Sequence, residues 1–342
     1  MLILTVPVID KGVTGTGRSA VVGNTRGITG RWRTWVIGVA FVVLVGFYAD
    51  RVSALDLGPL SGIAPPEGVT GLSLEGSERS LSGRLDVGAG MNVDATIERR
   101  SANLRLGRGF SLAGQPAYVY GEIPFIDYDL SGQAASQFDL DGGRGVGDAA
   151  LALAVWPLAD RVRGRFVGVA GYLIAPTGEY DAGRTLGANL NPGSNRYAGI
   201  FQMGLHQRLP AGFEWSLAAD VMVFGDNDDY IGDRVTVGPG GLTPARPATL
   251  EVKPYSSYQT ALAWRAHPAV TLAASYYLDR GGAARINGGD WSASVNRDRY
   301  GFWGLVALNR RTQLNISVKR VASDRSALSL DSAVQIRLVR FF

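Results

Sequence analysis

The chain has 342 residues, of which 46% are hydrophobic, and it has no cysteine, so a disulfide framework and a thiolate metal site are both excluded. Six of its 34 basic and two of its 30 acidic residues lie within positions 1–54, which leaves 28 of each sign in the remainder. Because that remainder is neutral, a nucleic-acid-binding function has no electrostatic support.

Residues 1–54 have the features of a secretory signal peptide. Arg31 and Arg33 precede an uninterrupted apolar run, Trp35–Tyr48, and the small residue that signal peptidase requires stands at Ala54. We expect cleavage between Ala54 and Leu55. The alternative is a membrane anchor, but the apolar run is shorter than a membrane-spanning helix. The unusual length of the leader suggests that the start codon has been assigned too early.

Most of the remaining chain alternates between apolar and polar residues, with the period of two that gives a β-strand one apolar face. From Phe213 the odd positions are apolar, and from Val270 the even positions are. In the last stretch the apolar set is Leu328, Leu330, Val334, Ile336 and Leu338. We expect about twelve such strands, which start near residues 84, 96, 117, 146, 164, 196, 213, 251, 269, 294, 312 and 327.

The connections between these strands alternate in length. Those at 157–163, 210–212, 267–268 and 309–311 are short, whereas those at 127–145, 177–195, 226–250 and 280–293 are long. Outer-membrane barrels have short periplasmic turns and long external loops, and an even number of strands. The sequence therefore predicts an all-β protein, a transmembrane antiparallel up-and-down barrel of the outer-membrane type over residues 84–342. Residues 55–83 lack periodicity and are expected to form a periplasmic N-terminal segment, with a small luminal plug as the alternative.

The chain ends in Phe341-Phe342, and counting back by twos from Phe342 gives mainly apolar residues. A terminal strand of this kind resembles the signal that the barrel assembly machinery recognises. Arg340 departs from that pattern, although at the membrane rim its side chain can extend to water.

One segment resembles a known family. Pro176-Thr177-Gly178-Glu179-Tyr180-Asp181 is followed by Leu186–Asn189 and Gly193–Arg196, and Gly147-Asp148 opens the preceding hairpin. Together these resemble the "putative MetA-pathway of phenol degradation" outer-membrane proteins over roughly residues 84–342. The resemblance implies a barrel linked to the uptake of aromatic or other hydrophobic compounds, and it carries no catalytic residues.

The strand registers predict which side chains line the lumen. Polar residues of both charge signs are expected to face inward with several aromatic residues, and the candidates for a ligand path are Tyr118, Tyr120, Trp156, Arg196, Gln202, Asp220, Gln259, Asp279, Gln313 and Arg337. Such a lumen suits a narrow path for small, partly apolar molecules, and it equally suits a closed structural barrel.

The loop Asp226–Leu250 is the longest, and irregular segments of this length are commonly functional. We expect it to fold inward and narrow the lumen, with Tyr230 at the constriction. Its acidic start could hold calcium, but Ile231 stands where a calcium loop of the helix-loop-helix type requires glycine, so a solvated loop without metal is favoured. We expect no cofactor.

An enzyme is the least favoured function. A lipid hydrolase needs a nucleophile oriented by a base, and the two histidines, His206 and His267, both fall near short turns, away from the outer leaflet. The sequence favours a channel for facilitated diffusion of small hydrophobic or aromatic compounds. The alternative is a structural or adhesive barrel that acts through its external loops. Expected partners are the solute, outer-membrane lipid, lipopolysaccharide and the barrel assembly machinery, without nucleic acid.

Overall fold

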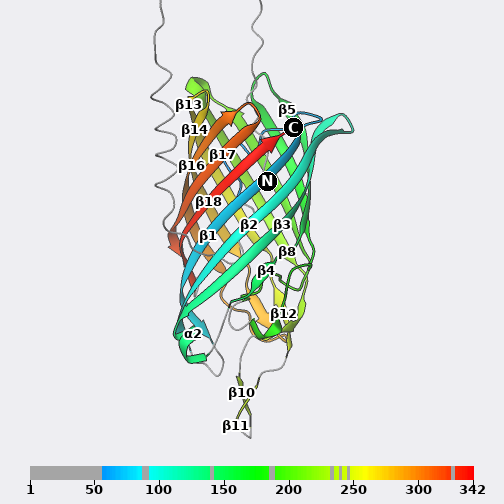
Figure 1. Ribbon diagram of the computed structural model, residues 1–342. Helices are drawn as coiled ribbons and strands as arrows, with labels where there is room; N and C mark the ends of the chain where they lie inside the picture. Colours follow the sequence, from blue (N-terminus) through cyan, green and yellow to red (C-terminus); the bar gives the residue numbers. More distant parts are fainter. Residues whose placement is uncertain are drawn as a thin grey trace, which may run out of the picture. The chain divides into compact units, whose positions relative to one another are not determined.

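The computed structural model describes residues 56–86, 92–138, 142–184, 189–231, 235–238, 241–244, 247–324 and 328–342. The predicted signal peptide, residues 1–54, and its predicted cleavage site between Ala54 and Leu55 lie outside these residues. Within them, twelve long antiparallel strands form one closed sheet (Figure 1). They are β1 (Thr70–Asp86), β2 (Asn92–Leu112), β3 (Gln115–Gly132), β5 (Ala150–Asp160), β6 (Arg165–Ile174), β7 (Ala198–Arg208), β8 (Phe213–Phe224), β13 (Tyr255–His267), β14 (Val270–Gly281), β16 (Val295–Asn309), β17 (Thr312–Asp324) and β18 (Leu328–Phe341).

Neighbouring strands pair in an up-and-down order, and β1 pairs with β18 to close the ring. The predicted fold class is therefore confirmed. Alternation sets the two faces of the wall: Phe201 and Met203 on β7 are 70% and 59% exposed, whereas Gln202 between them is 4% exposed. An apolar outer surface and a polar inner one are what a barrel in the bacterial outer membrane requires. Among the described residues, no helix is long and apolar enough to cross a bilayer.

The two ends of the barrel differ in their connections. One end has tight turns, such as Ala113-Gly114 between β2 and β3, where both residues have positive φ (48° and 78°) as a two-residue hairpin turn requires. The other end carries the long loops and their short elements: α2 (Gln133–Phe138), β4 (Arg144–Val146), β9 (Asn227–Tyr230), β10 (Val235–Gly238), β11 (Gly241–Pro244), β12 (Ala248–Val252) and β15 (Ala284–Ile286). By the rule for outer-membrane barrels, the first end faces the periplasm.

The predicted start of the barrel at residue 84 is wrong. β1 begins at Thr70, so residues 70–83 are part of the wall and not of a periplasmic segment. The alternation in this strand is concealed because Gly76 and Glu78 occupy outward positions that apolar residues fill in other strands. Only Leu72 and Leu74 mark its outer face.

One residue of the last strand faces the opposite way from our prediction. Ser80 pairs with Ser332 and Leu81 pairs with Leu330, so Asp331 is an extra residue that bulges out of β18. A bulge of one residue reverses the facing of everything on its far side. Leu330 is therefore buried beside Leu81, and the lipid-facing set is smaller than the sequence pattern suggested.

Candidate functional site

Residues 56–69 fill part of the barrel lumen, and we call this segment the plug. Leu60 and Ala64 are buried, although the segment belongs to no strand. Leu60 packs with Ala263 and Trp303 of the wall, and Ala64 joins a cluster of aromatic residues. The luminal location that we considered as the alternative is the observed one.

Asp56, at the start of the plug, anchors it to the barrel wall. Its carboxylate accepts two hydrogen bonds from the Arg299 guanidinium, at 2.9 and 3.0 Å, and pairs with Lys319 Nζ at 2.6 Å. Burial by itself would raise the pKa of this carboxyl, but Arg299 and Lys319 hold it well below its usual range. Arg299 is held in turn by Asp279, at 2.6 Å. The anchor is therefore ionised and fully paired.

The plug backbone is also hydrogen-bonded to the wall. The Leu57 N–H donates to Gln259 Oε1 (2.8 Å), and Trp156 Nε1 donates to the Gly62 carbonyl (2.9 Å). Arg161 Nη2 donates to two further plug carbonyls. A Cβ on Gly62 would lie 2.7 Å from His206 Cβ, so only glycine fits at this close approach. The segment is thus seated along its length.

Polar side chains continue around the lumen from strand to strand. We call them the polar belt. Its contacts are Glu75–Arg337, Arg105–Glu122, Tyr172–Gln202 (3.0 Å), Asp220–Gln259 (3.0 Å) and Ser257–Asp279 (3.0 Å). Glu75 is neutralised by Arg337, and Arg105 by Glu122. A solute in the belt therefore meets a polar wall whose charges are largely compensated.

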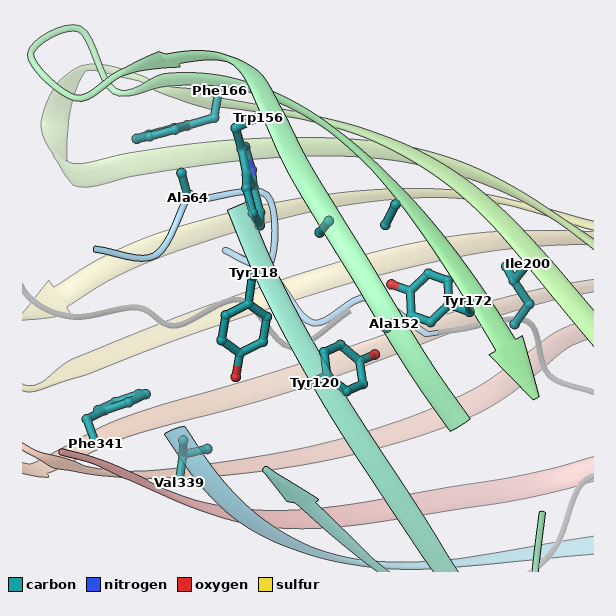
Figure 2. Close-up of a cluster of buried hydrophobic side chains, with 12 residues drawn as sticks. Ala64, Tyr118, Tyr120, Ala152, Trp156, Phe166, Tyr172, Ile200, Val339 and Phe341 are labelled. Carbon is teal, nitrogen blue, oxygen red and sulfur yellow. The ribbon is translucent and has the colours of Figure 1, made fainter. Parts of the chain in front are cut away.

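Aromatic side chains form a second layer, next to the periplasmic end of the plug. Figure 2 shows Tyr118, Tyr120 and Tyr172 pointing into the same space as Trp156 and Phe166. The Tyr118 and Tyr120 rings are 5.8 Å apart, and the Tyr120 and Tyr172 rings are 6.1 Å apart. The Arg105 guanidinium lies over Tyr120, 4.4 Å from its centroid. Tyr118, Tyr120 and Tyr172 are at most 7% exposed, so this part of the lumen is filled by packed aromatic rings beside a few polar groups.

The ligand-path candidates fall into two groups. Nine of the ten are buried on the inner side: Tyr118, Tyr120, Trp156, Gln202, Asp220, Gln259, Asp279, Gln313 and Arg337. Arg196 instead precedes β7 in the external loop, where its guanidinium lies 4.7 Å from the centroid of the Phe224 ring. Asp56, Glu75 and Arg105 were missed, because the first strands were displaced in our assignment and no periodicity marked the plug.

The wall has one irregular seam, between β1 and β2. Their backbones pair at Thr70–Arg108 and again over Arg84–Asp86, but no ladder pair joins the strands between these points, although both are described throughout. β2 and β3, in contrast, pair continuously from Ala95 to Leu112. Along most of its length, the β1–β2 seam therefore has no backbone ladder to join the two strands.

Side chains bridge the seam in place of the backbone. Ser77 Oγ lies 2.8 Å from Ser101 Oγ, Arg100 Nε donates to Glu78 (2.7 Å), and Asn103 Nδ2 donates to Glu75 (3.3 Å). A cavity of about 540 Å³ adjoins these contacts. It is lined by residues that face outward and by residues that face inward, among them Gly76, Ala102, Phe125, Ser77, Ser101 and Ile126. The cavity is thus lined by residues of both faces of the wall.

Of the residues that carry the family resemblance, 186–188 lie outside the described residues, and the others lie at the external loops. The Asp148 carboxylate accepts hydrogen bonds from the N–H groups of Gly178 and Ser194 (3.0 and 2.8 Å) and from Ser194 Oγ (2.6 Å). Gly178 and Gly193 touch backbone to backbone, where a Cβ would lie 2.7 Å from its neighbour. These residues form a clamp between the loops that follow β6 and precede β5 and β7.

The same clamp extends to the long loop. Tyr180 Oη donates to the Asp229 carbonyl (2.6 Å) and accepts from Asn227 Nδ2 (2.8 Å). Burial raises the pKa of Tyr180 to about 12, so its hydroxyl keeps its proton. Tyr230, our constriction candidate, is buried on β9 opposite Ala248 of β12. The base of the loop is therefore ordered, and no metal-binding group of acidic or histidine residues occurs among the described residues.

His206 has partners on both ring nitrogens. Nε2 lies 3.0 Å from Glu214, and Nδ1 lies 3.0 Å from Ser216 Oγ. Ser216, His206 and Glu214 are the residue types of a hydrolase site, but Glu214 also pairs with Arg265 (2.6 Å), and Gly62 of the plug packs against the Cβ of His206. It lies near the short turns, as the sequence predicted, and it fastens β7 to β8 beneath the plug.

The fold is shared with a solved channel structure. An outer-membrane channel from Pseudomonas putida F1 superimposes with a TM-score of 0.70 at 21% identity, over 84% of this chain and all of that one. The β domain of the Bordetella autotransporter BrkA reaches a TM-score of 0.48 at 16% identity, over 81% of this chain and all of that one. No curated protein sequence matches the chain.

The sequence itself matches a family model over residues 73–332, from the first strand to the last. The match includes the clamp residues Asp148, Gly178 and Ser194, the bridged seam and all of the polar belt except Arg337. The chain therefore belongs to the family described as "Putative MetA-pathway of phenol degradation", and it is an outer-membrane β-barrel.

Proposed function

We propose that the barrel carries small hydrophobic or aromatic compounds across the outer membrane by facilitated diffusion. The observation that supports this proposal is the cavity at the β1–β2 seam, which is lined by residues of both faces of the wall and adjoins exposed apolar residues such as Phe125. An apolar solute dissolved in the membrane meets this cavity without first entering water. It leaves lipid and passes between the middle parts of two strands, which are paired through their backbones only at their ends.

The axial route suits hydrophilic solutes poorly. The plug occupies the lumen, and the ion pairs of the polar belt would have to be separated or solvated to admit a charged molecule. Beyond the seam lies the aromatic layer of Tyr118, Tyr120 and Tyr172, whose packed rings would have to move apart for a flat solute to stack on them. The ligand-path candidates of the inner wall, with Arg196 and Tyr230 nearer the external mouth, are the groups that we expect the solute to meet.

A disulfide across the seam tests the proposal. The chain has no cysteine, so Ser77→Cys with Ser101→Cys places one pair of thiols at positions whose hydroxyl oxygens are 2.8 Å apart. Uptake of toluene by cells, or by liposomes that contain the purified protein, is measured before and after reduction. Oxidation should abolish the protein-dependent uptake, and reduction should restore it.

The matched control is Ser317→Cys with Gln335→Cys, a facing pair in the continuous β17–β18 ladder. Its oxidation should leave uptake unchanged. If both disulfides leave toluene uptake intact while the barrel remains folded, the solute does not pass the seam. A protein that promotes no uptake in any redox state would favour the structural or adhesive barrel.

A further inference from the structure

Exposed arginines surround the periplasmic end of the barrel. They lie at or next to the short turns and at the end of β18: Arg108, Arg161, Arg163, Arg165, Arg208, Arg265, Arg310, Arg311 and Arg340. In the described part of the chain, the carboxylates at this end are Asp160, which pairs with Arg163, Glu214, which pairs with Arg265, and exposed Glu67. The rim therefore has an excess of positive charge, which would attract an anionic membrane surface.

Two of these arginines flank the first strand on its lipid-facing side. Arg108 of β2 stands opposite Thr70, and Arg340 of β18 stands opposite Leu72, one step further along the same outer face. Among the described residues, neither has a carboxylate within ion-pair distance. Arg340 lies over the Phe342 ring, 5.6 Å from the centroid, and Phe342 is itself 61% exposed. Both guanidiniums are therefore free to bind an anion at the level of the lipid headgroups.

An apolar surface continues from these arginines toward the membrane centre. Four exposed leucines cover both sides of the seam: Leu72, Leu74, Leu104 and Leu106. In the register of the seam, Leu72 faces Leu106 and Leu74 faces Leu104. The backbones do not pair here, so these side chains lie along the unpaired part of the seam. Positive charge at the rim above a leucine-lined seam matches a molecule with an anionic head and an acyl tail.

We propose that Arg108 and Arg340 bind the phosphate of an anionic phospholipid from the periplasmic leaflet, and that one acyl chain lies along the four leucines. Guanidinium groups bind phosphate oxygens through paired, charge-assisted hydrogen bonds. A lipid held in this way covers the outer side of the seam at its periplasmic half. The site is independent of the solute that the barrel carries.

Native mass spectrometry of the full-length protein, purified from outer membranes, tests the site. The protein is titrated in detergent with phosphatidylglycerol or with phosphatidylcholine of the same acyl chains. Arg108→Gln with Arg340→Gln should weaken phosphatidylglycerol binding about 30-fold, since each basic residue near an anionic lipid contributes about a factor of five. Phosphatidylcholine should bind weakly to wild type and variant alike.

The control removes the same charge elsewhere on the rim, with Arg163→Gln and Arg208→Gln, and it should retain wild-type affinity. An equal loss in the control would mean diffuse attraction and no site, which would overturn the proposal. Equal competition by inorganic phosphate, or stronger retention of lipid A than of phosphatidylglycerol, would also overturn it. If the double variant does not assemble, each single variant should lose about fivefold, and single variants with wild-type affinity would reject the site.

Discussion

The lumen is closed in two directions by two different kinds of contact. Along the axis, the plug is fixed by a buried ion-pair cluster at Asp56 and by hydrogen bonds from its backbone. Through the wall, the β1–β2 seam is held in its middle by side chains such as the half-exposed pair Arg100–Glu78. Breaking a buried ion pair costs about 3–5 kcal/mol, whereas an exposed pair contributes about 0.2–1 kcal/mol. The side-chain contacts across the seam are thus individually weaker than the ion pairs that fix the plug.

The largest effect is expected where the axial closure is broken. Asp56→Asn removes the anionic partner of Arg299 and Lys319 and should weaken docking of the plug by about 3–5 kcal/mol. Single-channel recordings should then show a several-fold larger ion conductance than wild type. Glu67→Gln, at an exposed position of the same segment, should leave the conductance unchanged.

Acid should reproduce that variant in the wild-type protein. Arg299 and Lys319 hold the pKa of Asp56 well below its usual range, so its contribution is complete above about pH 4 and is lost as the pH falls further. Conductance should therefore be constant from pH 8 to pH 5. A wild-type conductance that already rises near pH 6 would show that another group controls the plug.

A variant of the external clamp tests whether the loops help to hold the plug in place. Asp148→Asn turns an ionised acceptor of three hydrogen bonds into a neutral one and should lower the free energy of unfolding by about 1.5–3 kcal/mol. Heat-modifiable gel mobility and a thermal melt would measure this loss. Conductance at low temperature should stay at the wild-type level, and a rise would mean that the loops hold the plug.

Filling the cavity at the β1–β2 seam tests whether the solute passes through the wall there. Gly76→Trp places an indole at the outer side of the seam, where a Cβ meets no other atom, and should reduce toluene uptake about tenfold, or 1.4 kcal/mol. Gly304→Trp is the matched control, since Gly304 also has open space around it and lies in a continuous ladder. Equal uptake by the two variants would contradict the lateral route.

The smallest effect is expected from loosening the seam. Arg100→Ala removes ion pairs with Glu78 and Glu98 that are about half exposed and should cost about 0.2–1 kcal/mol. Uptake of toluene should rise by up to about fivefold if seam opening limits the rate, while stability remains nearly unchanged. Lower uptake would show that the ion pairs guide the solute and do not restrain the strands.

The wall was predictable because one physical requirement acts on every strand. A lipid-facing residue must be apolar and its neighbours must face the polar lumen, so the outward position of Phe201 and the inward position of Gln202 follow from alternation alone. The bulge at Asp331 escaped prediction because the sequence on both sides of it remains plausible in either register. The facing of Leu330 depends on its partner strand, which a single sequence does not reveal.

The contacts of the plug and of the clamp could not be predicted from the sequence, for different reasons. The plug is stabilised by contacts with residues more than 90 positions away, such as Gly62 with Trp156 and Asp56 with Lys319, and such contacts leave no local pattern. The Pro-Thr-Gly-x-Tyr motif was visible, and it pointed to the family. Its physical role became clear only when Asp148 was seen between Gly178 and Ser194.

The incomplete backbone pairing of β1 with β2 also affects the order in which the strands pair during assembly of the barrel. With β2 it shares backbone pairs only at its two ends, so its continuous partner is β18. The two strands meet through residues as far apart as Glu75 and Arg337, 262 positions along the chain. The first strand to be synthesised is therefore the last to gain a full partner, and such long-range pairing is slow. A chain interrupted before Leu328 would present β1 and β17 as two unpaired edges, the state that invites aggregation and degradation.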